Sequence, residues 1–196
     1  MENGLRPAIF LDRDGTINVE KEYLFKIEDF EYMPWVTDGL RELADMGFLL
    51  VIVTNQSGIA RGFYTEDDFR KLNDWMLADL ERKKIKIAGI YYCPHYLGGS
   101  VPRYAVSCNC RKPLTGLFWR AQEELGIDMD RSFAVGDKMR DLAICNESGA
   151  RGILLGNCEG KAIGKNIREC RDFYKAVKLI TTWKDIPLNG AWMMDK

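Results

Sequence analysis

Apolar and polar positions alternate along the chain in two recurring patterns. Short apolar runs, from Ala8 to Leu11 and from Phe48 to Val53, are typical of strands buried on both faces of a parallel sheet. Between them, apolar residues recur at helical spacing, at Val36, Leu40, Leu43 and Ala44. Gly47 follows as a stop signal for that helix. The first fifty residues therefore predict a strand, a helix and a second strand.

The same alternation continues further along the chain. Thr65 is placed to cap a helix with an apolar face up to Leu80, Gly126 closes a helix that begins near Leu117, and 140–148 reads as another helix. Further strands are predicted at 87–92, 132–135, 152–155 and 176–180. This order predicts an α/β fold: an open, mainly parallel Rossmann-like sheet with helices on both faces. The length of 196 residues fits a single domain over 1–196 with a loop insertion at about 93–110.

Composition excludes several classes of function. The net charge of −1 gives no overall attraction for nucleic acid or anionic lipid, and no apolar run reaches the ~18 residues of a membrane span. No signal peptide is predicted near Glu2 and Arg6, so we expect a cytoplasmic protein with reduced thiols. We also expect a monomer without nucleic-acid or membrane partners. The single histidine excludes mechanisms that need several.

Two acids follow the first predicted strand, in the string Phe10-Leu-Asp-Arg-Asp-Gly-Thr16. Asp137 follows a later strand, and the carboxyl ends of parallel strands share one edge of the sheet. Clustered carboxylates there favour a hard cation such as Mg²⁺. Because turns are rich in Asp, Asp12 and Asp14 alone would also fit a solvated loop. Gly15 allows a tight turn directly after them.

The longer string is more specific, because Asp-x-Asp-Gly-Thr resembles the haloacid dehalogenase-like phosphotransferases, as do Thr54, Lys112 and Gly136-Asp137. The resemblance implies that Asp12 attacks phosphorus to form an aspartyl-phosphate and that Asp14 carries the proton. Mg²⁺ would bind the Asp12 carboxylate, the Asp14 backbone carbonyl and Asp137. Thr54 and Lys112 would stabilise charge on the transferring oxygens.

A second metal site is predicted in the insertion. Cys93-x-His95 and Cys108-x-Cys110 are separated by twelve residues, and one imidazole with three thiolates is the ligand set of a closed structural Zn²⁺ site. The alternative is buried thiols beside an unrelated histidine. The Gly- and Pro-containing spacer cannot build a core, so zinc would order it and hold Arg111 and Lys112 at the edge of the active site.

Five longer strings are more specific still: Asp12–Asn18, Thr54–Gly62, Tyr91–His95, Cys108–Pro113 and Gly136–Lys138. They resemble the D-glycero-D-manno-heptose-1,7-bisphosphate phosphatases, a family in the histidinol-phosphatase-like branch. The resemblance covers nearly the whole chain in order, from about Ala8 to Pro187. The resemblance implies removal of the 7-phosphate, with the β anomer favoured, in ADP-heptose and lipopolysaccharide core biosynthesis.

It also implies substrate contacts at Glu20, Lys21, Glu22, Tyr23, Asn55, Gln56, Ser57, Arg111 and Lys138. We expect Arg111 to bind the unreacted phosphate, because a guanidinium can grip two phosphate oxygens. Glu22 departs from the family, which commonly has Gly there, and places an anion near an anionic substrate.

Other readings remain. A histidinol-phosphate phosphatase or another small phosphomonoester phosphatase is the alternative enzyme, and a zinc-stabilised binding module without turnover is the alternative outside catalysis. The Cys-x5-Arg string at 145–151 starts inside a predicted helix, and the P-loop-like string at 156–161 has the wrong spacing, so both are interpreted as chance. Four tryptophans are expected in or against the core: Trp35, Trp75, Trp119 and Trp183.

Overall fold

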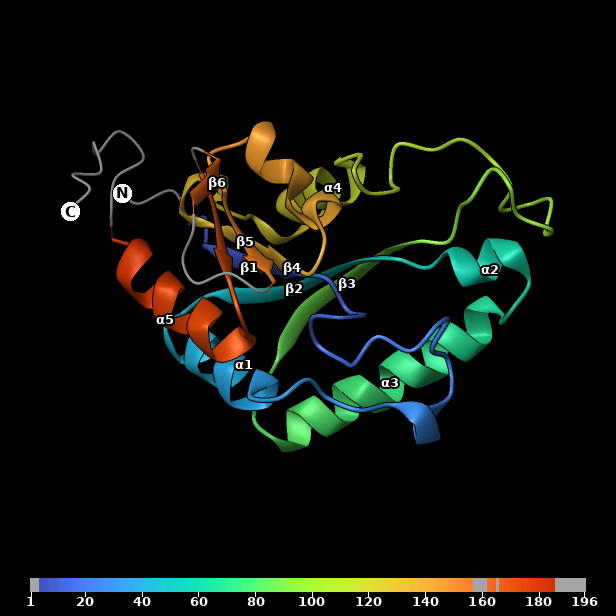
Figure 1. Ribbon diagram of the computed structural model, residues 1–196, viewed down its shortest axis with the longest axis horizontal. Coiled ribbons are helices and arrows are strands. Elements are labelled where there is room, and N and C mark those ends of the chain that lie inside the picture. The colour runs from blue at the N-terminus through green and yellow to red at the C-terminus, as the bar shows by residue number, and fades with distance from the viewer. Residues whose placement is uncertain (1–3, 157–161, 165, 186–196) are drawn as a thin grey trace.

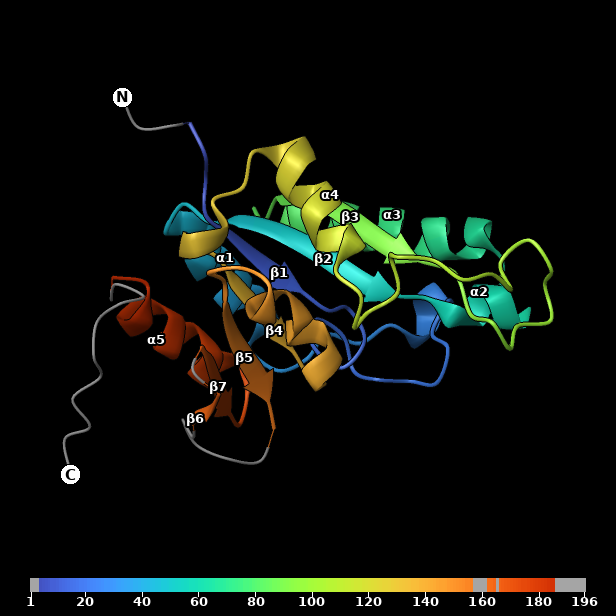
Figure 2. The same cartoon turned by 90° about the horizontal axis from the view of Figure 1, so that it is seen from above.

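The computed structural model describes residues 4–156, 162–164 and 166–185, and the account of the fold is confined to them. Their centre is a seven-stranded sheet with the order β3-β2-β1-β4-β5-β7-β6 (Figures 1 and 2). The strands are β1 (Ala8–Leu11), β2 (Leu49–Asn55), β3 (Ile87–Cys93), β4 (Phe133–Gly136), β5 (Arg151–Leu155), β6 (Ala162–Gly164) and β7 (Ile167–Cys170). All neighbours pair in parallel except β6 and β7. The prediction of an open, mainly parallel sheet is confirmed.

Helices cover both faces of the sheet. In Figure 1, α1 (Val36–Asp45), α3 (Glu66–Arg82) and α5 (Phe173–Trp183) lie below it, whereas α4 (Gly116–Leu125) and the 3-10 helix η3 (Met139–Asn146) lie above. The short helices are α2 (Ser57–Arg61), η1 (Ile27–Asp29) and η2 (Met129–Arg131). No helix among the described residues is long and apolar enough to cross a bilayer.

The central strands are buried on both faces, as their continuous apolar runs predict. In β1, Ile9 and Leu11 pack into the core layer under α1, α3 and α5, and Ala8 and Phe10 pack into the layer under α4. All four side chains are at most 2% exposed. Successive strand residues point to opposite faces, so a strand between two helical layers has to be apolar at every position.

Two predicted helix ends are confirmed. Thr65 caps α3 by accepting the N–H of Asp68, whose carboxylate accepts the N–H of Thr65 in return. Gly126 ends α4 with a left-handed φ of 63°.

The strand predicted at 176–180 is wrong, because these residues lie within α5. Ala176, Val177 and Ile180 are spaced for one face of a helix and are buried together with Trp183. The side chain of Asp172 accepts the N–H of Lys175 and starts the helix. The last parallel strand is instead β7, which the sequence analysis did not identify.

Two further expectations need correction. The helix predicted at 140–148 is the 3-10 helix η3 at Met139–Asn146. Trp35 is 62% exposed and Trp119 is 38% exposed, so neither belongs to the core, whereas Trp183 is buried and Trp75 packs against the core. Cys145 lies in η3 and burial raises the pKa of its thiol to about 12, which opposes a role as a nucleophile. Residues 157–161 of the P-loop-like string lie outside the described part of the chain.

Candidate active site

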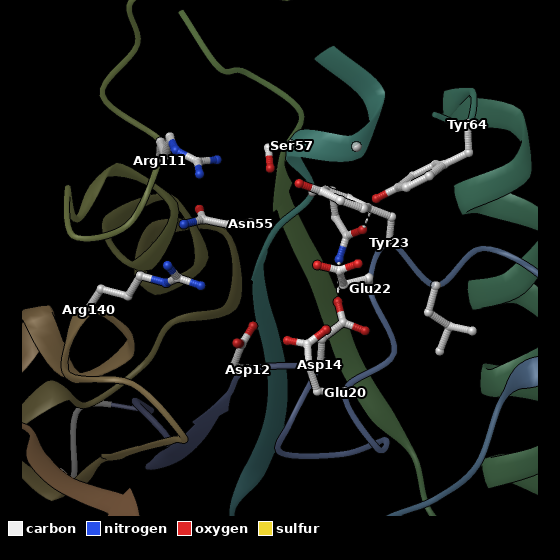
Figure 3. Close-up of a pocket in the computed structure, with 13 residues that line it drawn as sticks. Asp12, Asp14, Glu20, Glu22, Tyr23, Asn55, Ser57, Tyr64, Arg111 and Arg140 are labelled. Carbon is white, nitrogen blue, oxygen red and sulfur yellow. Dashed lines mark hydrogen bonds between the residues drawn. The ribbon is translucent and has the colours of Figure 1, made fainter. Parts of the chain in front are cut away.

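A cavity of about 260 Å³ opens where β1 and β2 end (Figure 3). β1 lies between β2 and β4, where the strand order changes direction, which is where ligands bind in open α/β sheets. Asp12 and Asp14 lie at the base of the cavity. Most of the predicted substrate contacts line its walls: Glu20, Glu22, Tyr23, Asn55, Gln56, Ser57 and Arg111.

A buried ion-pair network lies beneath the cavity. The Nζ of Lys112 lies 2.9 Å from Oδ1 of Asp12 and 2.7 Å from Oδ1 of Asp141, and it donates to the carbonyl of Val53 at 2.7 Å. Lys112 and Asp141 are 2% and 3% exposed. Lys112 therefore sits between two carboxylates, with its three N–H donors directed at three oxygens.

Asp137 reaches the same place from the end of β4. Gly15 has a left-handed φ of +84°, and a Cβ at this position would lie 2.6 Å from Oδ2 of Asp137. Only glycine satisfies both conditions without strain. The tight turn predicted at Gly15 is present, and it packs closely against Asp137.

Asp12, Asp137 and Asp141 each offer a carboxylate oxygen, and these oxygens lie within 4.8 Å of one another. Burial raises the pKa of Asp12; Lys112 lowers it, and the charges of Asp141 and Asp14 raise it further. Oδ1 of Asp137 is buried without a hydrogen-bond partner among the described residues. Oxygen ligands, excess negative charge and a buried oxygen without a partner fit a bound Mg²⁺.

The Asp14 side chain turns away from this group and is held by donors. Arg13, which is fully buried, donates to both of its oxygens, and Asn18 donates to Oδ1 at 3.0 Å. Gln56 donates to Oδ2 at 2.9 Å. Only the backbone carbonyl of Asp14 was expected to bind the metal. The side-chain carboxylate is therefore not needed as a metal ligand, and its donors hold it in a fixed orientation.

The residues that follow β2 have separate partners. The side chain of Asn55 donates to the carbonyl of Lys112 and accepts its N–H, both at 3.0 Å. Gln56 donates to the hydroxyl of Thr54 at 3.0 Å, and Thr54 is 1% exposed. Asn55 and Gln56, expected as substrate contacts, thus also hold other residues of the site.

Lys21 does not join the other predicted contacts. Its Nζ donates to the carbonyl of Asp29 at 2.7 Å and lies 3.5 Å from Glu31, and it does not line the cavity. Lys138 does not line the cavity either, but its Nζ lies 3.1 Å from Asp137 and 3.4 Å from Glu20, which does line it.

The four predicted zinc ligands come together beside the cavity. Sγ of Cys93 lies 3.1 Å from Sγ of Cys110 and 3.7 Å from Sγ of Cys108, and Nδ1 of His95 lies 3.3 Å from Sγ of Cys110. A tetrahedral site with Zn–S bonds of about 2.3 Å has sulfur atoms about 3.7 Å apart. The donor types and the Cys93–Cys108 separation fit Zn²⁺, and the four ligand atoms all lie within 4.8 Å of one another. Four protein ligands would leave no open position.

Three residues of the site were missed in the sequence analysis. Asp141 lies four residues after Asp137, a spacing that could have signalled a second carboxylate. Arg140 lines the cavity on the same side as Arg111, and Glu20 and Glu22 lie on the other side in Figure 3. Among the described residues, the Arg140 guanidinium makes no hydrogen bond or ion pair. Tyr64 reaches the cavity from the residue before the α3 cap, where nothing in the sequence distinguishes it from a core aromatic.

Comparisons with known proteins agree with this geometry. A family profile described as Polynucleotide kinase 3 phosphatase matches residues 8–184. A D-glycero-beta-D-manno-heptose-1,7-bisphosphate 7-phosphatase of Yersinia pestis is 52% identical over 69% of this chain and 72% of its own length, and one of Escherichia coli K12 is 52% identical over 69% and 71%. The solved D,D-heptose 1,7-bisphosphate phosphatase of B. bronchiseptica, complexed with magnesium and phosphate, is 26% identical, with a TM-score of 0.75, over 90% of this chain and 98% of that chain. The chain belongs to the D-glycero-beta-D-manno-heptose-1,7-bisphosphate 7-phosphatase family, and it is a phosphoric monoester hydrolase with the haloacid dehalogenase-like fold.

Proposed function

We propose that the protein removes the 7-phosphate of D-glycero-D-manno-heptose 1,7-bisphosphate, with preference for the β anomer, and supplies heptose 1-phosphate to ADP-heptose and lipopolysaccharide core biosynthesis. The names of the curated relatives support the substrate. The observation that carries the chemistry is the group of Asp12, Asp137 and Asp141 around Lys112 at the base of the cavity.

The proposed reaction has two displacements at phosphorus. An oxygen of Asp12 attacks, the bond to the sugar oxygen breaks, and the leaving alkoxide takes a proton from Asp14. Water then attacks the aspartyl-phosphate and gives a proton to Asp14, which releases inorganic phosphate and restores both carboxyl groups. When bound, Mg²⁺ supplies positive charge that lets the phosphoryl dianion approach the carboxylate. Lys112 holds Asp12 in place, and Thr54 has a hydroxyl to offer to a phosphoryl oxygen.

Selection of a bisphosphate is explained by the cationic wall of the cavity. Arg111 and Arg140 lie on one side of Figure 3, with Asp12 below them. A phosphate at the far end of the sugar can meet these guanidinium groups while the reacting phosphate lies at Asp12. Glu22, at the opposite wall, disfavours an anion there and so directs the second phosphate to the arginines.

The anionic wall favours a second candidate, histidinol phosphate, whose ammonium group could pair with Glu20 and Glu22. Measuring kcat/KM for heptose bisphosphate and histidinol phosphate with Mg²⁺ present decides between them. We expect a preference of at least ~100-fold for the bisphosphate, the equivalent of about 2.7 kcal/mol from two arginine contacts. Equal values, or a preference for histidinol phosphate, would contradict the proposed substrate. The absence of Mg²⁺-dependent phosphate release from any phosphomonoester would favour a binding module.

A further inference from the structure

A chain of hydrogen bonds runs from Tyr64 to Asp14. The hydroxyl of Tyr64 donates to Oε1 of Gln56 at 2.5 Å, and Nε2 of Gln56 donates to Oδ2 of Asp14 at 2.9 Å and to Oγ1 of Thr54 at 3.0 Å. Gln56 is 2% exposed and Tyr64 is 6% exposed. Every polar atom of the Gln56 side chain therefore has a protein partner in a buried place.

The direction of the chain follows from what each group can donate. The Asp14 carboxylate accepts from its neighbours, so the nitrogen of the Gln56 amide has to face it. The amide oxygen then faces Tyr64, which has to donate its proton. Burial raises the pKa of the Tyr64 phenol, so the hydroxyl stays protonated. The Thr54 oxygen accepts from Gln56, which leaves the Thr54 hydrogen available for a phosphoryl oxygen.

The ring of Tyr64 is tightly placed. It stacks on Phe25 with a centroid distance of 5.4 Å and an interplanar angle of 18°. A Cβ at Gly58 would lie 2.2 Å from the ring, so any side chain at that position would displace it. The hydroxyl is thus aimed at Gln56 by packing on both sides.

We propose that Tyr64 is a positioning residue that acts through Gln56 to orient the Asp14 carboxyl for proton transfer. This inference rests on the proposed function, in which Asp14 protonates the leaving alkoxide. Without the Tyr64 hydroxyl, the buried amide oxygen loses its partner, and a turned amide would set that oxygen against Asp14. Asp14 would then spend less time in its productive orientation.

This role predicts an effect that depends on the leaving group. A sugar alkoxide needs a proton to leave, whereas p-nitrophenolate is a weak base and leaves without one. Loss of an oriented Asp14 should therefore lower kcat/KM for a sugar phosphate and spare kcat/KM for p-nitrophenyl phosphate. This ratio reports the first displacement only, before Asp14 serves the hydrolysis of the aspartyl-phosphate that both substrates share. A defect that only loosens the fold should slow both substrates equally.

The test compares Tyr64→Phe with Asp14→Asn and with the matched control Tyr92→Phe, in full-length protein with Mg²⁺. Tyr92 is a partly buried tyrosine whose hydroxyl also donates one side-chain hydrogen bond, here to Oε1 of Glu66 at 2.8 Å. Its partner is not part of the hydrogen-bond chain that ends at Asp14. For Tyr64→Phe we expect kcat/KM to fall ~10-fold with the best sugar phosphate and less than ~2-fold with p-nitrophenyl phosphate, as one hydrogen bond of typical strength would give. Tyr92→Phe should leave both values near those of the wild type.

A second variant, Gln56→Met, keeps the length of the side chain and removes its hydrogen bonds with Tyr64, Asp14 and Thr54, so it should show the same split between substrates. Equal losses on the two substrates in both variants, or no loss in either, would overturn the inference. If Asp14→Asn shows the split and Tyr64→Phe does not, the positioning role fails and the proposed function stands. If Asp14→Asn itself shows no split, the proton-transfer role of Asp14 is wrong, and the inference fails with it.

Discussion

Arg111 and Lys112 are adjacent in the sequence, but different parts of the molecule hold them. Lys112 is fixed by Asn55 through two backbone hydrogen bonds and by its ion pairs with Asp12 and Asp141. Arg111 donates to the carbonyl of His95 at 3.2 Å and lies 5.5 Å from the ring centroid of Tyr96. His95 and Tyr96 belong to the insertion at about 93–110 that carries the zinc ligands. Removal of zinc should therefore release Arg111 and leave Lys112 in place.

The energetics of the loop give the size of the effect. None of the twelve residues between His95 and Cys108 is buried, so the loop gains little from apolar burial. Its contacts with the rest of the chain are hydrogen bonds at a partly exposed surface, such as those from Ser100 to the carbonyl of Arg61 and from Tyr104 to Glu66. Fixing their backbone costs at least about 12 kcal/mol, which is comparable to the about 10–16 kcal/mol that a structural zinc supplies. Without zinc the loop loses its order. The loss of one charged contact between Arg111 and phosphate, worth about 1.5–3 kcal/mol, lowers kcat/KM for the bisphosphate roughly 10- to 150-fold.

The assay compares heptose bisphosphate with p-nitrophenyl phosphate before and after treatment with a zinc-selective chelator, at a constant millimolar Mg²⁺ concentration. We expect the loss on the bisphosphate and a change of less than ~3-fold on p-nitrophenyl phosphate, and added Zn²⁺ should restore the first value. Arg111→Gln in the zinc-loaded protein is the matched reference and should reproduce the profile. An equal loss on both substrates would show that Lys112 also depends on zinc and would refute this reasoning.

Three further substitutions test the base of the cavity. Asp12→Asn should fold with the far-ultraviolet circular dichroism spectrum of the wild type and lose more than ~1,000-fold in kcat, because the amide is not a nucleophile; turnover near the wild-type rate would exclude Asp12 from that role. Gly15→Ala should lower the free energy of unfolding in urea by about 1–3 kcal/mol and weaken Mg²⁺ activation, because of its φ of +84° and the 2.6 Å approach to Asp137; unchanged stability and activation would contradict this. Asp141→Asn leaves Lys112 with one carboxylate and should lower kcat at least ~100-fold in steady-state assays; a wild-type kcat would mean that Asp141 serves stability alone.

The central sheet was predictable because its strands are apolar at every position. The carboxyl ends of β1, β2 and β4 were located correctly, and so were the capped helix after Thr65 and the four clustered Cys and His residues. In these segments the local signal and the tertiary environment agree. The last third of the chain was less predictable. The apolar residues between Ala176 and Ile180 in α5 form a short run that fits a buried strand as well as one face of a helix.

Residues of the site were missed where their role depends on a partner distant in sequence. Arg140 is an ordinary exposed arginine until the fold places it in the wall of the cavity. Tyr64 gains its hydrogen bond only because α2 turns the chain back towards Gln56. In the opposite direction, Lys21 was expected in the cavity because its neighbours are there. The chain turns at this point, where the N–H of Leu24 donates to the carbonyl of Lys21, and the Lys21 side chain pairs with Asp29 and Glu31 instead.

The chemistry is confined to one rim of the sheet. The turns at the other rim, such as 46–48 before β2 and 83–86 before β3, contribute no residue to the cavity. Selection for turnover and selection for folding therefore act on separate loops. A library that varies the turns before β2 and β3 should yield thermostable variants with intact catalysis. A library of the same size in the loops that line the cavity should yield mostly inactive enzymes.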